Sequence, residues 1–466
     1  MSKEITIHSP IDNRIVGTIP VLSQSDVDRI MKEAKASQKE WENIPIYQKA
    51  EILYHAADLL EERVEQLSEI LMYEIAKDKK SAISEIKRTA DFIRFSADAG
   101  KSMEGIAVGG ENFPGGSKEK LSYVRRVPLG IVLAISPFNY PVNLSASKIA
   151  PALIGGNAVV LKPATQGALS ASLLVDIFHE AGVPINVLQL VTGKGSEIGD
   201  YIVTHEDVDF VNFTGSTEVG KHIAQIVSMT PLMMELGGKD AAIVLPDADL
   251  EFVADNIVEG AFSYSGQRCT AVKRVLTDDR TADLLIPMLK ARIEKLKVGA
   301  PQDNSVIVPL INQQAFDFAQ GLIDDALEKG ATLIIGNKKE NTIMYPTLLD
   351  HVNEDMRIAW EEPFAPILPI IRIKDQEDAI RVANMSEYGL QSSVFTNNIN
   401  TAYYIANQLE VGTVQINNKT ERGPDHFPFL GVKASGMGTQ GVKYSIEAMT
   451  RPKAITIHLL NQKRNH

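Results

Sequence analysis

The sequence predicts an α/β protein built on parallel sheets, and two observations support this fold class. From Leu121 onward, short runs rich in β-branched residues alternate with helical segments that begin near Ser, Thr, Asn or Gln. Such alternation is typical of βαβ units. The 466 residues are 44% hydrophobic and 23% charged, enough for two or three folded domains. The predicted strands include GIVLAI, NAVVLK, VLQLVTG, DFVNFTG and AAIVL.

The first hundred residues are expected to be mainly helical after a short β-like start. Three amphipathic stretches are predicted at residues 25–41, 48–77 and 81–101, and a turn-rich segment at residues 109–117 follows them. At the other end, residues 454–460 alternate as a strand. That strand can return to pair elsewhere, including with another chain.

Composition excludes several classes of function. Lys and Arg total 47 and Asp and Glu total 59, and the net charge of -12 disfavours a nucleic-acid partner or an anionic membrane surface. The first ten residues lack the apolar core of a secretory signal, and the longest apolar runs are too short to span a membrane, so a cytoplasmic location is expected. A single cysteine excludes an intramolecular disulfide and a cysteine-based metal cluster, and no metal site is predicted.

That cysteine, Cys269, is a candidate nucleophile. It lies in the segment FSYSGQRCTAVKR, after a predicted helix at residues 250–262. The neighbouring Arg268 is expected to favour the thiolate electrostatically. Free cysteines are also commonly inert core residues, so the segment alone leaves both interpretations open.

Two further residues are candidates for chemistry at the same site. Glu235 follows an apolar run and precedes Gly237 and Gly238, where backbone can approach a ligand closely. It is a candidate general base, or a strand-end residue paired with Lys239. Asn139 lies in a loop bounded by prolines, between a predicted buried strand and a predicted helix. Its amide can stabilise an oxyanion, or it can serve the turn.

Two glycine-containing segments are candidates for binding a nucleotide. GKGSEIG at residues 193–199 and GSTEVGKH at residues 215–222 each follow a predicted strand and open a predicted helix. Neither matches the dinucleotide fingerprint or the phosphate-loop pattern. Helix N-termini nevertheless favour phosphate groups, so a nucleotide site of a non-standard kind is predicted.

Taken in order, the segments PFNYP, LKP, FTGST, ELGGKD, GQRC and EEPF resemble the aldehyde dehydrogenase superfamily from about residue 8 to the C-terminus. The resemblance implies the aldehyde dehydrogenase fold: two Rossmann-like parallel-sheet domains and a small β element for oligomerisation. It implies an NADP-binding domain at residues 1–120 and 131–236, a catalytic domain at residues 237–418, and the β element at residues 121–130 and 445–466. A homotetramer is expected.

Longer runs, including AISPFNYPVNLSASKIAPALI, YSGQRCTAVKRVL and INNKTERGPDHFPFLG, are most similar to one group in the superfamily. That group oxidises D-glyceraldehyde 3-phosphate irreversibly to 3-phosphoglycerate with NADP and without inorganic phosphate. The resemblance implies a thioester on Cys269, an oxyanion held by Asn139, and hydrolysis by water that Glu235 activates.

The expected partner is therefore a small phosphorylated aldehyde. The resemblance implies that its phosphate is bound by Arg88, Tyr140, Arg268 and Arg422. Guanidinium groups suit phosphate oxygens, but they also bind carboxylates. A succinate-semialdehyde or hydroxyaldehyde dehydrogenase using NAD or NADP therefore stays open, as does a non-catalytic cofactor-binding protein with this fold.

For the cofactor, the resemblance places Lys162 on the adenosine ribose and Thr165 where NAD-preferring relatives often carry Glu. Because a carboxylate there would repel a 2′-phosphate, NADP is expected. Ala365, Pro424 and His426 depart from the family pattern. The residues implied in cofactor binding are Ser136, Pro137, Lys162, Thr165, Gly215, Ser216, Leu236, Glu362 and Phe364.

Overall fold

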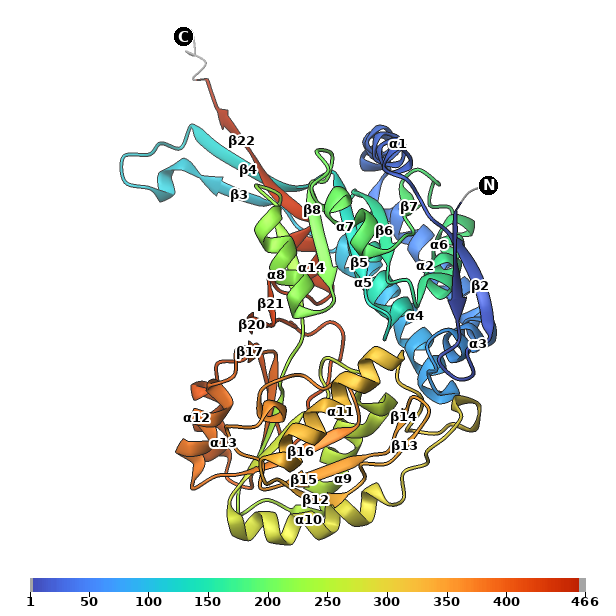
Figure 1. Cartoon of the computed structure of the whole chain (residues 1–466). Coiled ribbons are helices and arrows are strands. Elements are labelled where there is room, and N and C mark those ends of the chain that lie inside the picture. The colour runs from blue at the N-terminus through green and yellow to red at the C-terminus, as the bar shows by residue number, and fades with distance from the viewer. Residues whose placement is uncertain (1–2, 461–466) are drawn as a thin grey trace, which may run out of the picture.

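The structure, a computed structural model, describes residues 3–460; residues 1–2 and 461–466, which the expected domain bounds include, lie outside the described residues. Two large sheets form the body of the molecule, and a three-stranded arm projects from it (Figure 1). The fold class predicted from the sequence is confirmed. No helix among the described residues is long and apolar enough to cross a membrane.

The first large sheet has six strands in the order β21-β9-β8-β5-β6-β7. The last five run parallel, and β21 adds antiparallel to β9. Residues of β6 are all buried, as expected for a strand covered on both faces. The strands are β5 (Ile131–Ser136), β6 (Ala158–Pro163), β7 (Leu188–Leu190), β8 (Phe210–Thr214), β9 (Leu232–Glu235) and β21 (Gly436–Met437).

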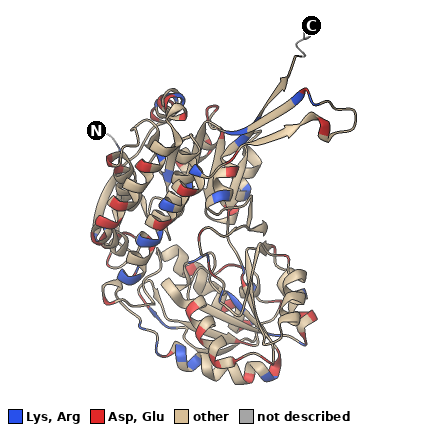
Figure 2. Ribbon diagram, turned by 180° about the vertical axis from the view of Figure 1, so that it is seen from behind, with Lys and Arg blue, Asp and Glu red and all other residues tan. Residues whose placement is uncertain are grey.

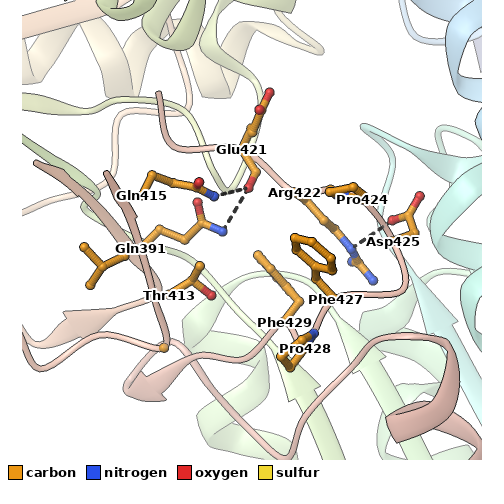
Figure 3. Close-up of a pocket in the computed structure, with 13 residues that line it drawn as sticks. Gln391, Thr413, Gln415, Glu421, Arg422, Pro424, Asp425, Phe427, Pro428 and Phe429 are labelled. Atoms are coloured by element: carbon orange, nitrogen blue, oxygen red, sulfur yellow. Dashed lines mark hydrogen bonds and ion pairs between the residues drawn. The ribbon is translucent and has the colours of Figure 1, made fainter. Parts of the chain in front are cut away.

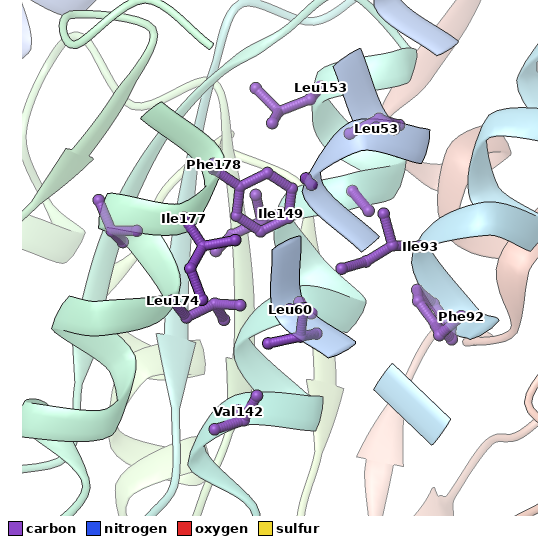
Figure 4. Close-up of a cluster of buried hydrophobic side chains, with 14 of the residues drawn as sticks. Leu53, Leu60, Phe92, Ile93, Val142, Ile149, Leu153, Leu174, Ile177 and Phe178 are labelled. Carbon is purple, nitrogen blue, oxygen red and sulfur yellow. The ribbon is translucent and has the colours of Figure 1, made fainter. Parts of the chain in front are cut away.

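Helices cover both faces of this sheet. Every residue of α5 (Pro141–Ile154) is buried, because α5 lies between the sheet and the N-terminal helices. Figure 4 shows the core that results, where Leu53, Ile93, Ile149 and Phe178 approach one another from four helices. The remaining connections are α6 (Ala168–Glu180), α7 (Gly195–Val203) and α8 (Thr217–Ile226).

The N-terminal segment begins with a hairpin of β1 (Glu4–His8) and β2 (Ile15–Pro20). The helices α1 (Gln24–Asn43) and α4 (Lys79–Lys101) confirm two of the predicted helical stretches. The prediction of one helix over residues 48–77 was wrong, since it is divided into α2 (Ile46–Glu62) and α3 (Val64–Glu74) at Arg63. Both halves are amphipathic, so hydrophobic periodicity does not reveal a break at one residue.

The second large sheet has seven strands in the order β12-β15-β16-β11-β10-β18-β19, parallel except for β12. Successive side chains of β10 pack into different hydrophobic clusters, as the alternation of a strand requires: Ala241 and Ile243 into one, Ala242 and Val244 into the other. The strands are β10 (Ala241–Val244), β11 (Arg274–Thr277), β12 (Thr332–Ile335), β15 (Thr347–Asp350), β16 (Ile367–Arg372), β18 (Gln391–Phe395) and β19 (Thr413–Ile416). The helices are α9 (Leu250–Phe262), α10 (Asp279–Ile293), α11 (Gln313–Glu328), α12 (Gln376–Asn384) and α13 (Ile399–Gln408).

The projecting arm has the strand order β22-β4-β3, with both pairings antiparallel. Its strands are β3 (Ile106–Gly109), β4 (Lys120–Pro128) and β22 (Thr450–His458), and α14 (Val442–Ala448) leads into it. The strand predicted near the C-terminus thus pairs with β4 of its own chain. Charged residues of both signs are mixed over the helices of the body (Figure 2). Two short pairs complete the strands: β13 (Lys339–Glu340) with β14 (Ile343–Met344), and β17 (Tyr388–Gly389) with β20 (Val432–Lys433).

Candidate active site

A cavity of about 1210 Å³ runs from the carboxyl ends of β5, β6 and β8 to the second large sheet. Carboxyl ends of parallel strands are the usual place for a ligand in an open α/β sheet. All nine residues predicted to bind the cofactor line this cavity, together with Asn139 and Cys269: Ser136, Pro137, Lys162, Thr165, Gly215, Ser216, Leu236, Glu362 and Phe364.

Cys269 is carried to the cavity by a reversal of the chain after α9. Tyr264, Ser265 and Gly266 have φ angles of 51°, 54° and 70°, a conformation that non-glycine residues rarely adopt. The surroundings hold the reversal in place. The Tyr264 hydroxyl donates to the Ile75 carbonyl at 2.7 Å, and the Ser265 Oγ both donates to the Val308 carbonyl and accepts from its N–H, each at 2.8 Å.

Glu235 lies beside the thiol. It ends β9, is buried, and its Oε1 is 3.4 Å from the Cys269 Sγ. Its Oε2 accepts from Arg422 Nη1 at 2.8 Å. The alternative pairing with Lys239 is not found, because Lys239 Nζ donates to the Glu361 carbonyl at 2.9 Å. A nucleophile from the segment before β11 and a candidate base from the end of β9 therefore meet.

The pKa of Cys269 lies well above its usual range, because burial and then the nearby Glu235 carboxylate disfavour the thiolate. Lys273 and Arg422 act in the opposite direction. The expectation that Arg268 favours the thiolate was wrong in this respect, because its guanidinium turns toward α9 and donates to the Gly260 carbonyl at 2.5 Å. The Arg268 Nε is buried without a hydrogen-bond partner among the described residues.

Lys273 was not identified from the sequence. Its buried ammonium donates to the carbonyl oxygen of Cys269 and lies 3.1 Å from Glu362 Oε1. One cation thereby joins the nucleophile segment to a carboxylate of the cofactor cavity. A lysine four residues after the cysteine, inside the mostly apolar stretch TAVKRVL, is a signal that could have indicated a buried, paired ammonium.

Asn139 connects the first large sheet to the cysteine segment. It lies between β5 and α5 and is buried, and its Nδ2 donates to the Gln267 carbonyl at 3.0 Å. Gln267 is two residues before the nucleophile. The amide therefore lies close to Cys269. A substrate carbonyl attacked by this cysteine would develop negative charge on its oxygen near the amide.

The four residues predicted to bind phosphate lie in three places: Arg88 and Arg422 together, Tyr140 beside Asn139, and Arg268 turned toward α9. Arg88 and Arg422 meet at Asp425: Arg88 donates to it from Nε at 2.5 Å and from Nη2 at 2.6 Å, and Arg422 Nε is 3.6 Å away. Tyr140, next to Asn139, has its ring 3.5 Å from Lys77 Nζ. Glu85, three residues before Arg88 on the same helix, pairs with Lys77 instead of Arg88.

The segment around Arg422 and Asp425 also lines a second cavity of about 300 Å³ beside β19 (Figure 3). Figure 3 shows the ion pair between these two residues at one end of this cavity. At the other end, Gln391 and Gln415 both donate to the Glu421 carbonyl, at 3.1 and 3.4 Å. These contacts fix the segment that carries Arg422.

The cofactor end of the large cavity fits a phosphorylated dinucleotide. The Lys162 ammonium is buried, burial lowers its pKa, and it has no carboxylate partner among residues 3–460. A buried cation without a counter-ion suits an anionic ligand. Gly215 and Ser216 precede and cap α8, whose N-terminus favours phosphate. At Gly237, a Cβ would lie 2.2 Å from Glu362 Oε2, so a larger residue there would displace that carboxylate from its present position.

Comparison with known proteins agrees with this geometry. The model of the aldehyde dehydrogenase family matches residues 1–455. An NADP-dependent glyceraldehyde-3-phosphate dehydrogenase of Streptococcus equinus is 55% identical over 452 residues, covering 97% of this chain and 95% of that protein. One from Pisum sativum is 48% identical, with 98% and 92% covered. The crystal structure of the NADP-dependent glyceraldehyde-3-phosphate dehydrogenase from Bacillus halodurans C-125, complexed with NADP, has a TM-score of 0.98 at 54% identity, covering 98% of this chain and 96% of that one.

Proposed function

This chain belongs to the aldehyde dehydrogenase family, and from that premise we propose that it oxidises D-glyceraldehyde 3-phosphate to 3-phosphoglycerate with NADP and without inorganic phosphate. The single observation that carries the chemistry is the contact between Cys269 and Glu235, with 3.4 Å between Sγ and Oε1. A thiol and a carboxylate at that separation supply a nucleophile for acylation and a base for hydrolysis.

In the first half-reaction the Cys269 thiol releases its proton to solvent, and the thiolate sulfur adds to the aldehyde carbon. The former carbonyl oxygen becomes an oxyanion, which we assign to the Asn139 amide and the backbone N–H of Cys269. Collapse of this adduct expels hydride and leaves a thioester on Cys269. Bound NADP would supply the hydride acceptor.

In the second half-reaction Glu235 takes a proton from water, and the water oxygen adds to the thioester carbon. The carbon–sulfur bond then breaks, and Cys269 leaves as the thiol. Water thus supplies the second carboxylate oxygen of the product, so no inorganic phosphate is consumed. The Arg422 contact at 2.8 Å supports this role because it holds the carboxylate beside the sulfur.

For the substrate phosphate we assign Arg88 and Arg422, with Tyr140 and Arg268 as further contacts. Support comes from the convergence of Arg88 and Arg422 on Asp425, because a shared carboxylate holds two cationic groups close together. A phosphate dianion needs such a pair of guanidinium groups. The same pair can hold a carboxylate, so substrate discrimination requires a direct test.

We assign the NADP-binding site to the part of the large cavity that lies at the carboxyl ends of β5, β6 and β8. Lys162 and Thr165 would hold the adenosine ribose and its 2′-phosphate, and Gly215 and Ser216 the pyrophosphate. Glu362, with Phe364 beside it, would hold the nicotinamide ribose. On this basis we propose residues 1–120 and 131–236 as the cofactor domain and residues 237–418 as the catalytic domain.

We also propose that the protein is a homotetramer in the cytoplasm, where reducing conditions keep a catalytic thiol free. The arm exposes apolar side chains, with Ile106 at 61% and Ile455 at 45% of full exposure. Strand β19 is an edge strand of the second sheet. A strand from a second copy of the chain can pair with this edge. Replacing Ile455 and Ile457 by lysine should reduce the assembly size in light scattering, whereas Ile185→Lys on the body should not.

An initial-rate assay without phosphate tests the activity. NADPH formation is compared for glyceraldehyde 3-phosphate and succinate semialdehyde, each with NADP and with NAD. We expect the highest kcat/KM for glyceraldehyde 3-phosphate with NADP. A higher value for the semialdehyde would replace the substrate assignment, and a higher value with NAD would replace the cofactor assignment.

A further inference from the structure

A pair of opposite charges lies buried beneath the active site. Lys77 and Glu85 form an ion pair, and both side chains are 0% exposed. Lys77 follows α3, and Glu85 lies on α4. Neither residue lines the cavity that holds Cys269. Both nevertheless contact the segment that carries Asn139.

Lys77 binds the start of that segment. Its Nζ donates to the backbone carbonyl of Asn139 at 2.6 Å. The same ammonium lies 3.5 Å from the ring centroid of Tyr140 and 4.9 Å from that of Tyr264. Tyr264 belongs to the chain reversal before Cys269, so one ammonium contacts the loops of both the nucleophile and the amide.

Glu85 binds the other end of the segment. Its Oε2 pairs with Lys77, and its Oε1 accepts from the backbone N–H groups of Val142 and Asn143, each at 3.0 Å. These N–H groups belong to the first turn of α5, where no intrahelical acceptor exists. Tyr140, the N-cap residue, supplies no side-chain cap, so a carboxylate from α4 takes that role.

Removing two charges from water is costly, and apolar residues of similar volume would often stabilise the fold equally well. Here the pair does something that apolar residues cannot, because it hydrogen-bonds a carbonyl and two N–H groups on both sides of Tyr140. The Asn139 side chain between these anchors donates to the Gln267 carbonyl at 3.0 Å. Lys77 and Glu85 thereby fix the position of the Asn139 amide relative to Cys269 through the backbone of its segment.

We propose that Lys77 and Glu85 are positioning residues: they hold the Asn139 amide where the oxyanion forms, without contacting substrate or cofactor. This inference rests on the proposed function, because it assumes that Cys269 forms a thiohemiacetal. It predicts a loss in the rate of acylation and little change in the affinity for NADP.

The test is a double-mutant cycle on the rate of the NADPH burst, measured by stopped flow with the full-length protein. Asn139→Ala should slow the burst by roughly 100-fold, as loss of one oxyanion donor does. Lys77→Met should slow it by about 10-fold or more. If Lys77 acts through the amide, the double variant should be about as slow as Asn139→Ala alone, because the two changes remove the same interaction.

Lys49→Met is the matched control, since Lys49 is also a buried lysine, 4% exposed, whose ammonium binds a backbone carbonyl, that of Glu42. It should lower the melting temperature but leave the burst rate within about 2-fold of wild type, as expected when no shared partner exists. Glu85→Gln is a milder second variant, because its amide oxygen can still accept from α5. It should slow the burst and keep the fold if Lys77→Met does not fold.

The results distinguish a positioning role of the ion pair from a purely structural one, and both from a failure of the proposed function. Multiplicative losses in the double variant, or a burst rate equal to that of Lys49→Met, would show that the ion pair has only a structural role. A fall in NADP affinity as large as the fall in burst rate would also overturn the inference. Absence of any burst in the wild-type protein with glyceraldehyde 3-phosphate and NADP would instead refute the proposed function, and the inference with it.

Discussion

Glu235 accepts a hydrogen bond from Arg422, with 2.8 Å between Oε2 and Nη1. Its other oxygen lies 3.4 Å from the Cys269 sulfur. Arg422 also approaches Asp425, which pairs with Arg88. One guanidinium therefore belongs to both ends of the site: it orients the candidate base, and it helps to form the candidate phosphate site. Tests of each role need variants that touch one end at a time.

Replacing Glu235 by glutamine should separate the two half-reactions. The Cys269 nucleophile and Asn139 stay in place, so a burst of NADPH close to one per active site is expected. Steady turnover should fall by roughly 10²- to 10⁴-fold, the usual contribution of a general base. Stopped-flow absorbance measures both phases. Loss of the burst together with the turnover would contradict the assigned role.

The pH dependence of thiol alkylation should report the charges around Cys269. Because burial and Glu235 raise its pKa, the iodoacetamide rate of the cofactor-free enzyme should rise with pH and reach its midpoint above the usual range of a cysteine. Glu235→Gln removes a negative charge that opposes the thiolate, so the midpoint should move to lower pH. Lys273→Met removes a cation that favours it, so the midpoint should move to higher pH.

The chain contains one cysteine, so labelling reads this site alone. An exposed acidic residue on α9 supplies the matched control: Glu259→Gln should leave the midpoint unchanged. A midpoint that moves upward in Glu235→Gln would show that the carboxylate does not face the sulfur in solution.

Local sequence predicted much of this architecture. The helix predicted at residues 250–262 is α9 with the same bounds, and the turn residues after it form the chain reversal before Cys269. Strand and helix patterns also placed Asn139 after a buried strand, where it lines the cavity, whereas Thr165 was identified only through the family resemblance. These features depend on hydrophobic periodicity and on motifs a few residues long, which a single sequence carries.

Contacts between residues far apart in the chain could not be predicted from the sequence. Arg88 and Asp425 are separated by 337 positions, and no local pattern indicates that they pair. The same holds for Lys77 and Asn139, separated by 62 positions. The pKa of Cys269 depends on burial and on which cations lie nearby, and adjacency in sequence wrongly suggested Arg268. Such properties follow from packing, which is settled only in three dimensions.

Arg88 allows the phosphate site to be tested without disturbing the base, because it pairs with Asp425 and does not contact Glu235. A hydrogen bond to a charged group contributes about 1.5–3 kcal/mol, which is roughly ten- to hundredfold in affinity. Arg88→Met should therefore raise the KM for glyceraldehyde 3-phosphate by that factor and leave the KM for glyceraldehyde unchanged.

Arg94→Met is the matched control on the same helix, since Arg94 pairs with Asp58 and Glu61 on the outer side of α2. Its KM values should equal those of the wild type. An equal rise of KM for both aldehydes in Arg88→Met would indicate that Arg88 supports the fold of the site and does not bind the phosphate.

Thr165 should decide between the two cofactors. It lines the same cavity as Lys162, whose buried ammonium has no carboxylate partner among the described residues. In Thr165→Glu, a carboxylate beside Lys162 would neutralise that ammonium and repel the 2′-phosphate. About 1.4 kcal/mol of repulsion is enough to weaken NADP binding tenfold. NAD carries no such phosphate, so its affinity should change much less.

Titration calorimetry with each cofactor measures the two affinities directly. Thr165→Gln serves as the control, because it adds a side chain of similar size without the charge. We expect Thr165→Glu to lower the ratio of NADP to NAD affinity by roughly tenfold or more, and Thr165→Gln to lower it by much less. Equal losses in both variants would mean that crowding, and not charge, acts at this position, and a ratio unchanged in Thr165→Glu would place the 2′-phosphate elsewhere.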